Sequence, residues 1–152
     1  MGVMIAAIRP GHWDLPLFLH VAGAMLLVGA LVVVVVTMAV ALRNGDGVEV
    51  LTQLALRTLL IGVIPAYVLM RAGAEWIASE EGVPDDLDWI GIGYGVADGG
   101  LLLTLIAAVL AWRVARRGAA GPGGLGRAVF VLAALLIVAY GIAIWAMATK
   151  PA

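Results

Sequence analysis

Four long apolar segments, separated by short polar stretches, make up most of this chain. They cover residues 15–42, 57–77, 89–112 and 128–147. A helix needs about 20 mostly apolar residues to cross the hydrocarbon core of a membrane, and each segment is that long. In lipid the backbone must satisfy its own hydrogen bonds, which favours helix even in β-branched runs. We therefore expect an all-α fold, an antiparallel bundle of four transmembrane helices that forms a single membrane domain over residues 1–152.

The second segment carries the clearest expected irregularity. Its helix begins between Val48 and Arg57 and has Pro65 inside the apolar run. Proline lacks a backbone N–H, and its ring clashes with the carbonyl one turn earlier. We therefore expect a kink at Pro65.

Composition supports a membrane protein and excludes several chemistries. The 152 residues are 64% hydrophobic and 12% charged, whereas soluble domains are about half apolar and about a quarter charged. The net charge of −1 gives no basis for nucleic-acid binding. Cysteine is absent, so disulfides, thiolate catalysis, iron–sulfur ligation and cysteine-ligated zinc are excluded.

Basic residues predict the orientation, because cytoplasmic loops of membrane proteins carry an excess of lysine and arginine. The connections after the first and third segments hold six arginines: Arg43, Arg57, Arg113, Arg116, Arg117 and Arg127. The opposite side holds Arg9, Lys150, a carboxylate-rich loop at 80–88 and most of the tryptophans. We expect a bacterial inner-membrane protein with both termini outside and the two basic connections in the cytoplasm.

Ionisable residues within the apolar segments are the candidate functional residues. A charge in hydrocarbon costs at least about 2.5 kcal/mol, so such residues normally face a partner or a cavity. The tryptophans at the outer boundary indicate depth, because five residues of helix span about 8 Å. By that measure, one polar residue from each helix lies at a common depth in the outer half of the membrane. This polar layer consists of His20, Arg71, Tyr94 and Tyr140, with Asp98 one turn deeper and Glu75 one turn shallower.

Three interpretations of the polar layer remain open from the sequence. In the first it is structural, and Arg71 pairs with Asp98 between helices or with Glu75 along one helix. In the second it forms the floor of a pocket open to the outer face, which binds an ion, a haem or a small polar molecule. In the third the side chains extend separately to the interface without a shared site.

His20 is the candidate haem or metal ligand. A lone buried histidine is more often part of hydrogen-bonded packing, but it can also fill one axial position of haem iron. Copper bound by His20 and methionine lacks a supporting Met-x-x-Met or histidine cluster. A zinc site from His20, Glu75 and Asp98 is the remaining metal alternative. The methionines available as a second axial haem ligand are Met25, Met38, Met70 and Met147, with Met70 nearest in depth.

Glycines in the third segment predict a helix-packing face. Gly91, Gly95 and Gly99 recur every four residues, a spacing that lets helices approach closely in lipid. We expect this face to pack within the chain, against the first helix near Gly23 and Gly29, in preference to a second copy.

Short motifs near both ends of the chain give a family resemblance. They are Leu19-His20-Val21, Gly23-Ala24, Leu26-Leu27 and Gly29 in the first segment, and Trp145, Met147 and Lys150-Pro151 at the end. This pattern resembles an uncharacterised family of small bacterial predicted integral membrane proteins, related to copper resistance protein D-like and J-type protoporphyrinogen oxidase-like membrane proteins. The resemblance implies a four-helix membrane bundle and marks His20 as a haem or metal position.

These features lead to three functional hypotheses. The first is a non-catalytic accessory protein or complex subunit, because the sequence shows no complete catalytic or ligand set. The second is a haem-associated redox protein using His20, and the third is transport of a proton or cation through the polar layer. The expected partners are the lipid bilayer and either a second copy or a larger membrane complex, with no nucleic acid.

Overall fold

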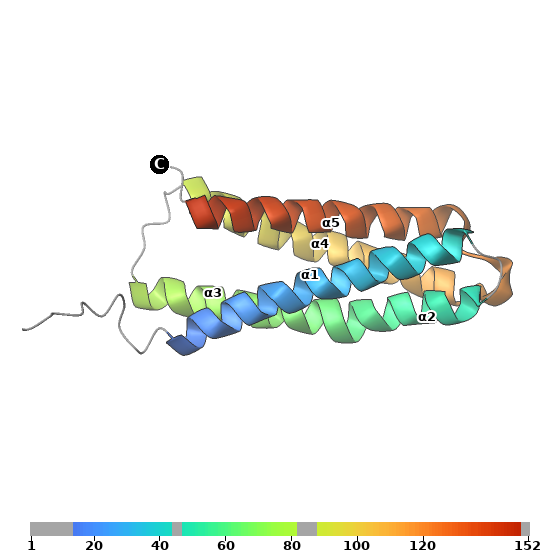
Figure 1. Ribbon diagram of the computed structural model, residues 1–152, viewed down its shortest axis with the longest axis horizontal. Coiled ribbons are helices and arrows are strands. Elements are labelled where there is room, and N and C mark those ends of the chain that lie inside the picture. Colours follow the sequence, from blue (N-terminus) through green and yellow to red (C-terminus); the bar gives the residue numbers. More distant parts are fainter. Residues whose placement is uncertain (1–13, 44–46, 82–87, 150–152) are drawn as a thin grey trace, which may run out of the picture.

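The computed structural model describes residues 14–43, 47–81 and 88–149, which form one bundle of four helical spans (Figure 1). The predicted all-α fold is confirmed for these residues. The elements in order are α1 (Asp14–Arg43), α2 (Val48–Thr58), a π-helical turn (Leu59–Val63), α3 (Ile64–Glu81), α4 (Asp88–Ala115), a 3-10 turn (Gly118–Ala120) and α5 (Gly123–Thr149). The N-terminal lead, part of the acidic loop and Lys150-Pro151 lie outside the described residues.

Each span is long and apolar enough to cross a membrane. The spans are Asp14–Arg43, Val48–Glu80, Ile90–Ala115 and Gly123–Thr149. They extend past the predicted segments, most clearly at the second, where α2 adds an amphipathic stretch before the apolar run. Many large side chains on the outside of the helices are apolar and exposed, as expected for surfaces that face lipid.

The expected disturbance at Pro65 takes the form of a π-helical turn. Leu59–Val63 ends two residues before the proline, and the Ile64 N–H bonds to the Leu59 carbonyl five residues earlier. Pro65 offers no N–H to the preceding turn, and a π-helical turn lets the helix continue through such a site. Consequently, α2 and α3 form one continuous span.

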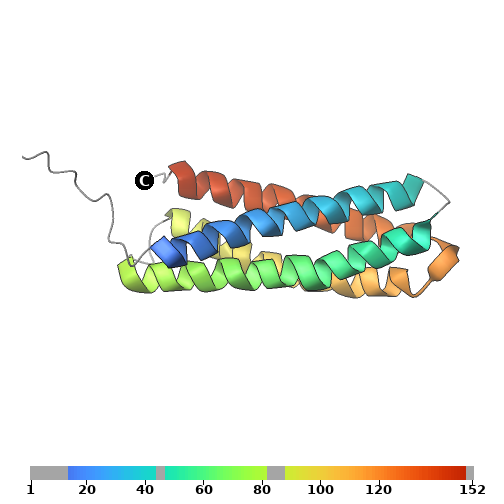
Figure 2. The ribbon, with the colours of Figure 1, turned by 60° about the horizontal axis from the view of Figure 1, so that its bottom comes forward.

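The bundle consists of two helix pairs. α1 packs on α3 and α4 packs on α5, whereas α3 and α4 barely touch. α1 begins beside α3 and crosses to α5 at its other end (Figures 1 and 2). We call the end where α1 begins and α5 finishes the terminal end. The opposite end, where α1 is followed by α2 and α4 by α5, is the basic end. Arg57, predicted in the first of these connections, lies instead within α2, because that helix already begins at Val48.

An apolar core fills the basic half of the bundle. Because lipid is as apolar as leucine, such a core is held by close van der Waals packing between helices. Its largest fully buried members are Leu27, Leu31, Val34, Met38, Leu59, Val63, Val129 and Leu136. The core closes the bundle on the basic side of the predicted polar layer.

α1 and α3 approach each other closely at two glycines. A Cβ on Gly73 would lie 2.5 Å from the His20 backbone nitrogen and 2.8 Å from the Pro16 carbonyl oxygen. A Cβ on Gly23 would lie 2.7 Å from the Met70 Cα. The two backbones therefore touch where neither glycine could carry a side chain. This contact places His20 directly against the backbone of α3.

The prediction that the glycine face of α4 packs against another helix of the same chain is wrong for the described residues. Its three glycines are exposed, and a Cβ on any of them would meet no described atom within 4 Å. They are Gly91, Gly95 and Gly99. The reason is the rotation of α4 about its axis, which turns Gly93 and Gly100 toward α5 instead, while Gly23 of α1 meets α3.

Candidate functional site

Arg71 on α3 contacts both carboxylates of the predicted polar layer, Glu75 and Asp98. Its Nη2 lies 3.0 Å from Oε1 of Glu75, one turn along α3, and 3.6 Å from Oδ1 of Asp98 on α4. The guanidinium also lies over the Tyr94 ring, 4.4 Å from the ring centroid, in a cation–π contact. The sequence left open whether Arg71 pairs with Glu75 or with Asp98. The structure shows both pairings, so one cation links α3 to α4 where the two backbones barely touch.

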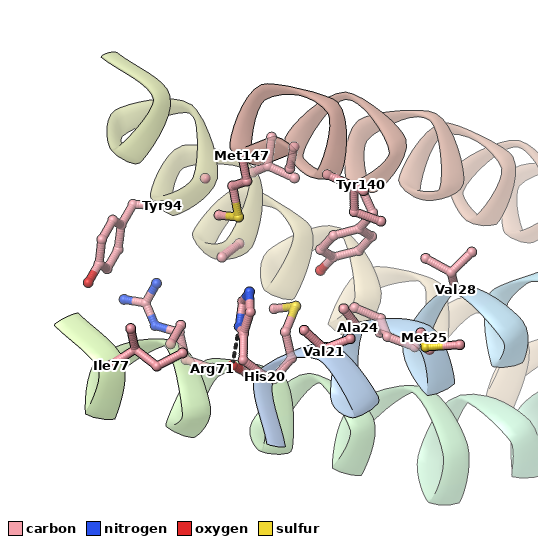
Figure 3. Close-up of a pocket in the computed structure, with 18 of the residues that line it drawn as sticks. His20, Val21, Ala24, Met25, Val28, Arg71, Ile77, Tyr94, Tyr140 and Met147 are labelled. Atoms are coloured by element: carbon pink, nitrogen blue, oxygen red, sulfur yellow. Dashed lines mark hydrogen bonds between the residues drawn. The ribbon is translucent and has the colours of Figure 1, made fainter. Parts of the chain in front are cut away.

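A single hydrogen bond fixes the orientation of His20 on α1. Its Nδ1 lies 3.0 Å from the Met70 carbonyl oxygen on α3. A carbonyl only accepts, so Nδ1 carries the proton and donates it to this bond. In the neutral ring, Nε2 then has a free lone pair. Figure 3 shows this nitrogen pointing away from the hydrogen bond, toward the α5 side.

His20 and Arg71 border a cavity of about 740 Å³ between the two helix pairs at the terminal end. Side chains from α1, α3, α4 and α5 line it. His20, Arg71, Tyr94 and Tyr140 are polar, and the remaining walls are mainly aliphatic. Binding sites for small molecules have volumes of about 300–1,000 Å³, with mostly apolar walls and a few placed polar groups. The cavity therefore has the size and lining of a ligand or cofactor site.

Tyr140 on α5 has an unpaired hydroxyl in the cavity wall. The residue is 4% exposed, and its Oη has no hydrogen-bond partner among the described residues. A Cβ on Gly100 of α4 would lie 2.5 Å from this oxygen, so glycine at that position makes room for the phenol. Buried hydroxyls are normally hydrogen-bonded. The oxygen itself is enclosed against α4, so the phenol must turn toward the cavity before a bound ligand can accept its hydrogen bond.

Methionines lie on opposite sides of the cavity. Met147 is on α5, and its sulfur points into the cavity toward the side that holds His20 (Figure 3). Met70 is on α3 and provides the carbonyl that holds His20. Met25 borders the cavity on α1 but is 71% exposed. Met38 is buried in the core of the basic half and does not line the cavity.

The structure brings most of the predicted polar residues to one place. The cavity wall includes His20, Arg71, Tyr94 and Tyr140. Glu75 and Asp98 do not line the cavity and instead contact Arg71. Sequence reasoning missed Gly73 and Gly100, which let neighbouring groups approach. Their only signal was a small residue in an apolar helix, which does not reveal what lies opposite.

The residues do not suit a bare metal ion. Across residues 14–43, 47–81 and 88–149, no group of three His, Asp or Glu side chains lies close enough to hold one. The zinc alternative from His20, Glu75 and Asp98 therefore has no ligand cluster among these residues, because both carboxylates contact Arg71. A haem makes a smaller demand, since its porphyrin supplies four nitrogens and the protein adds one or two axial ligands.

No family model, curated protein sequence or solved structure matches this chain. The family resemblance seen in the sequence therefore stays a prediction, and the function is inferred from the cavity itself.

Proposed function

We propose that this protein is a small subunit of a membrane redox system that binds one haem in the cavity between its helix pairs, with His20 as an axial ligand. The orientation of His20 supports this most directly, because Nδ1 donates to the Met70 carbonyl and Nε2 faces the cavity. Histidines that bind metals almost always make such a second hydrogen bond. It fixes the ring and raises the basicity of the ligating nitrogen.

The size and lining of the cavity fit a haem. Its volume of about 740 Å³ lies within the range of cofactor sites. Aliphatic side chains such as Ala24, Val28 and Ala97 provide apolar walls for a porphyrin ring. Tyr140 adds a phenol to the lining, which can donate to a ligand once it turns toward the cavity.

Arg71 suits the carboxylate edge of such a ligand. Its guanidinium lies beside Tyr94, at the part of the cavity near the terminal end (Figure 3). A guanidinium has five N–H donors, and the contacts to Glu75 and Asp98 are both made by Nη2, so other N–H groups remain for a ligand carboxylate. Arginine–carboxylate contacts are charge-assisted and directional. Arg71 would therefore orient the ligand by its edge, while His20 binds its centre.

Bound haem would supply one-electron redox chemistry. The chain's own residues set the conditions for it. His20 would hold the iron through Nε2, and its hydrogen bond to the Met70 carbonyl would make the imidazole a stronger donor. The apolar walls exclude water and so adjust the reduction potential.

Absorption spectroscopy of detergent-purified protein, oxidised and dithionite-reduced, tests this proposal. With an adequate haem supply during expression, we expect a Soret band in the wild type and its loss in His20→Gly. Added imidazole should restore the band, because it can occupy the space of the deleted ring. His12→Ala alters the other histidine, which lies outside the described residues, and should keep the band. A colourless wild type, or a Soret band that survives in His20→Gly without imidazole, would contradict the proposal.

A role as an accessory subunit of a larger complex has a separate observation in its favour. The glycine face of α4 is exposed, and the Asp98 side chain beside it is 67% exposed. A carboxylate and a close-approach face both suit contact with another transmembrane helix. Gly95→Leu should then shift the protein from a larger assembly to a monomer in native electrophoresis. Equal migration of the wild type and the variant would count against this role.

Proton or cation transport has no comparable observation in its favour, because buried aliphatic side chains fill the basic half beside the cavity.

For the localisation, we propose a bacterial inner membrane with the terminal end outside and the basic end in the cytoplasm. The arginines of the basic end, such as Arg43, Arg113 and Arg116, support this orientation. It would place the cavity in the outer half of the membrane.

A further inference from the structure

We propose that Met147 is the second axial ligand, opposite His20, an inference that rests on the proposed haem site. Two residues can bind opposite faces of one ring only if they come from opposite walls. His20 projects from α1, where α1 meets α3, and Met147 projects from α5. Figure 3 shows the Met147 sulfur and the His20 ring facing each other across the cavity.

The other methionines do not meet this requirement. Met70 lies on the same wall as His20, since its own carbonyl accepts the His20 hydrogen bond. Met38 is fully buried in the core of the basic half. Met25 is 71% exposed and projects largely outside the bundle. Met147 is the remaining methionine in the described part of the chain, and it is half-buried at the cavity. Depth along the sequence favoured Met70, whereas the walls of the cavity favour Met147.

The neighbouring helix positions the Met147 side chain. The Met147 Cε occupies the place that a Cβ on Gly93 of α4 would take. A larger residue at position 93 would push the thioether away from α4. Gly93 is therefore a positioning residue for the Met147 sulfur.

A histidine–methionine pair would define what the site does. Methionine as the second ligand raises the reduction potential of haem, as in electron-transfer cytochromes. With both axial positions filled by the protein, the iron has no open position for an external ligand. The site would then transfer electrons and not activate a small molecule.

Carbon monoxide is a suitable probe, because it binds reduced haem only at an open axial position. We expect the reduced wild-type protein to show a low-spin spectrum that carbon monoxide leaves unchanged over minutes. Met147→Leu should become high-spin, bind carbon monoxide with a shifted Soret band and show a lower midpoint potential. Met25→Leu is the matched control, since it removes an exposed methionine at the same cavity, and it should behave as the wild type.

Two further variants make the test independent of folding defects in Met147→Leu. Met147→His should restore a low-spin spectrum that excludes carbon monoxide. Gly93→Ala keeps the sulfur but displaces it, and should give partial carbon monoxide binding. If the wild type binds haem through His20 and also binds carbon monoxide as readily as Met147→Leu, the inference about Met147 is overturned and the haem site stands. If the wild type binds no haem, the proposed haem site and the inference about Met147 are both overturned.

Discussion

Tyr140 shows at the scale of one residue how the cavity differs from an ordinary bundle core. Its hydroxyl is buried and unpaired among the described residues, although the same ring could be a phenylalanine without leaving a gap. A buried hydroxyl without a partner costs about 1–3 kcal/mol. A ligand that accepts the hydrogen bond of Tyr140, once the phenol has turned toward the cavity, would remove this cost.

Tyr140→Phe should accordingly separate stability from binding. Without ligand we expect the thermal unfolding temperature in detergent to stay the same or rise, because an unsatisfied donor is removed. Binding of added haem should weaken by about 2- to 10-fold, the value of one neutral hydrogen bond of about 0.5–1.5 kcal/mol. Haem titration and thermal unfolding measure the two effects. A variant that is clearly less stable without ligand would show that the hydroxyl has a structural partner instead.

The sequence predicted most of the polar residues at the cavity but few of their contacts. His20, Arg71 and Tyr94 stand out because polar groups are rare in apolar segments. Their depth follows from helix geometry and the tryptophan boundary. The choice between Glu75 and Asp98 for Arg71 did not follow, because it depends on the rotation of α4 against α3. The unpaired state of Tyr140 likewise depends on what lies around its hydroxyl.

At the scale of helices, glycine contacts decide where the polar residues lie. Gly73 and Gly23 bring α1 onto α3, and this contact carries His20 to the Met70 carbonyl. The regular spacing of Gly91, Gly95 and Gly99 suggested a stronger packing signal, yet that face is exposed. The spacing shows that a helix face carries only small residues. Which of these faces packs against another helix depends on how the other helices are placed.

Gly73→Ala tests the helix contact. The added Cβ would lie 2.5 Å from the backbone nitrogen of His20, so α1 must move away from α3. We expect a loss of about 1–3 kcal/mol in the free energy of unfolding, measured by detergent denaturation, as for other overpacked sites. The variant should also bind haem more weakly, because the His20 hydrogen bond is disturbed.

Gly95→Ala is the matched control for Gly73→Ala. Its Cβ meets no described atom within 4 Å, and alanine is about 1 kcal/mol better than glycine in a helix. We expect equal or greater stability for Gly95→Ala in detergent. Equal losses for the two variants would show that α1 and α3 do not approach closely at Gly73.

At the scale of the whole molecule, the fold followed from hydropathy because a membrane permits few alternatives. Each apolar segment had to satisfy its backbone internally, which left helices as the solution. The ends of the helices did not follow from hydropathy alone: α2 is amphipathic, so its start at Val48 lay outside the apolar run. The cavity was not predictable in size or shape. It depends on the separation of α3 from α4, which no local pattern encodes.

The orientation can be tested by single-cysteine labelling, since the chain contains no cysteine. Ser79→Cys places a thiol at the terminal end, and Arg116→Cys places one at the basic end, both at exposed positions. In intact cells of a bacterial expression host, a membrane-impermeant maleimide should label Ser79→Cys. Arg116→Cys should react only after permeabilisation, because the arginine-rich end remains in the cytoplasm. The reverse pattern would invert the proposed orientation.

The haem content of the purified protein tests the central claim most directly. The pyridine haemochrome assay measures it independently of spin state and axial ligands. For protein purified from cells with an adequate haem supply, we predict about one haem per chain in the wild type and in His12→Ala. His20→Ala should retain only a small fraction of that amount. A wild type free of haem, or equal haem content in His20→Ala and the wild type, would contradict His20 as the ligand of a haem in this cavity.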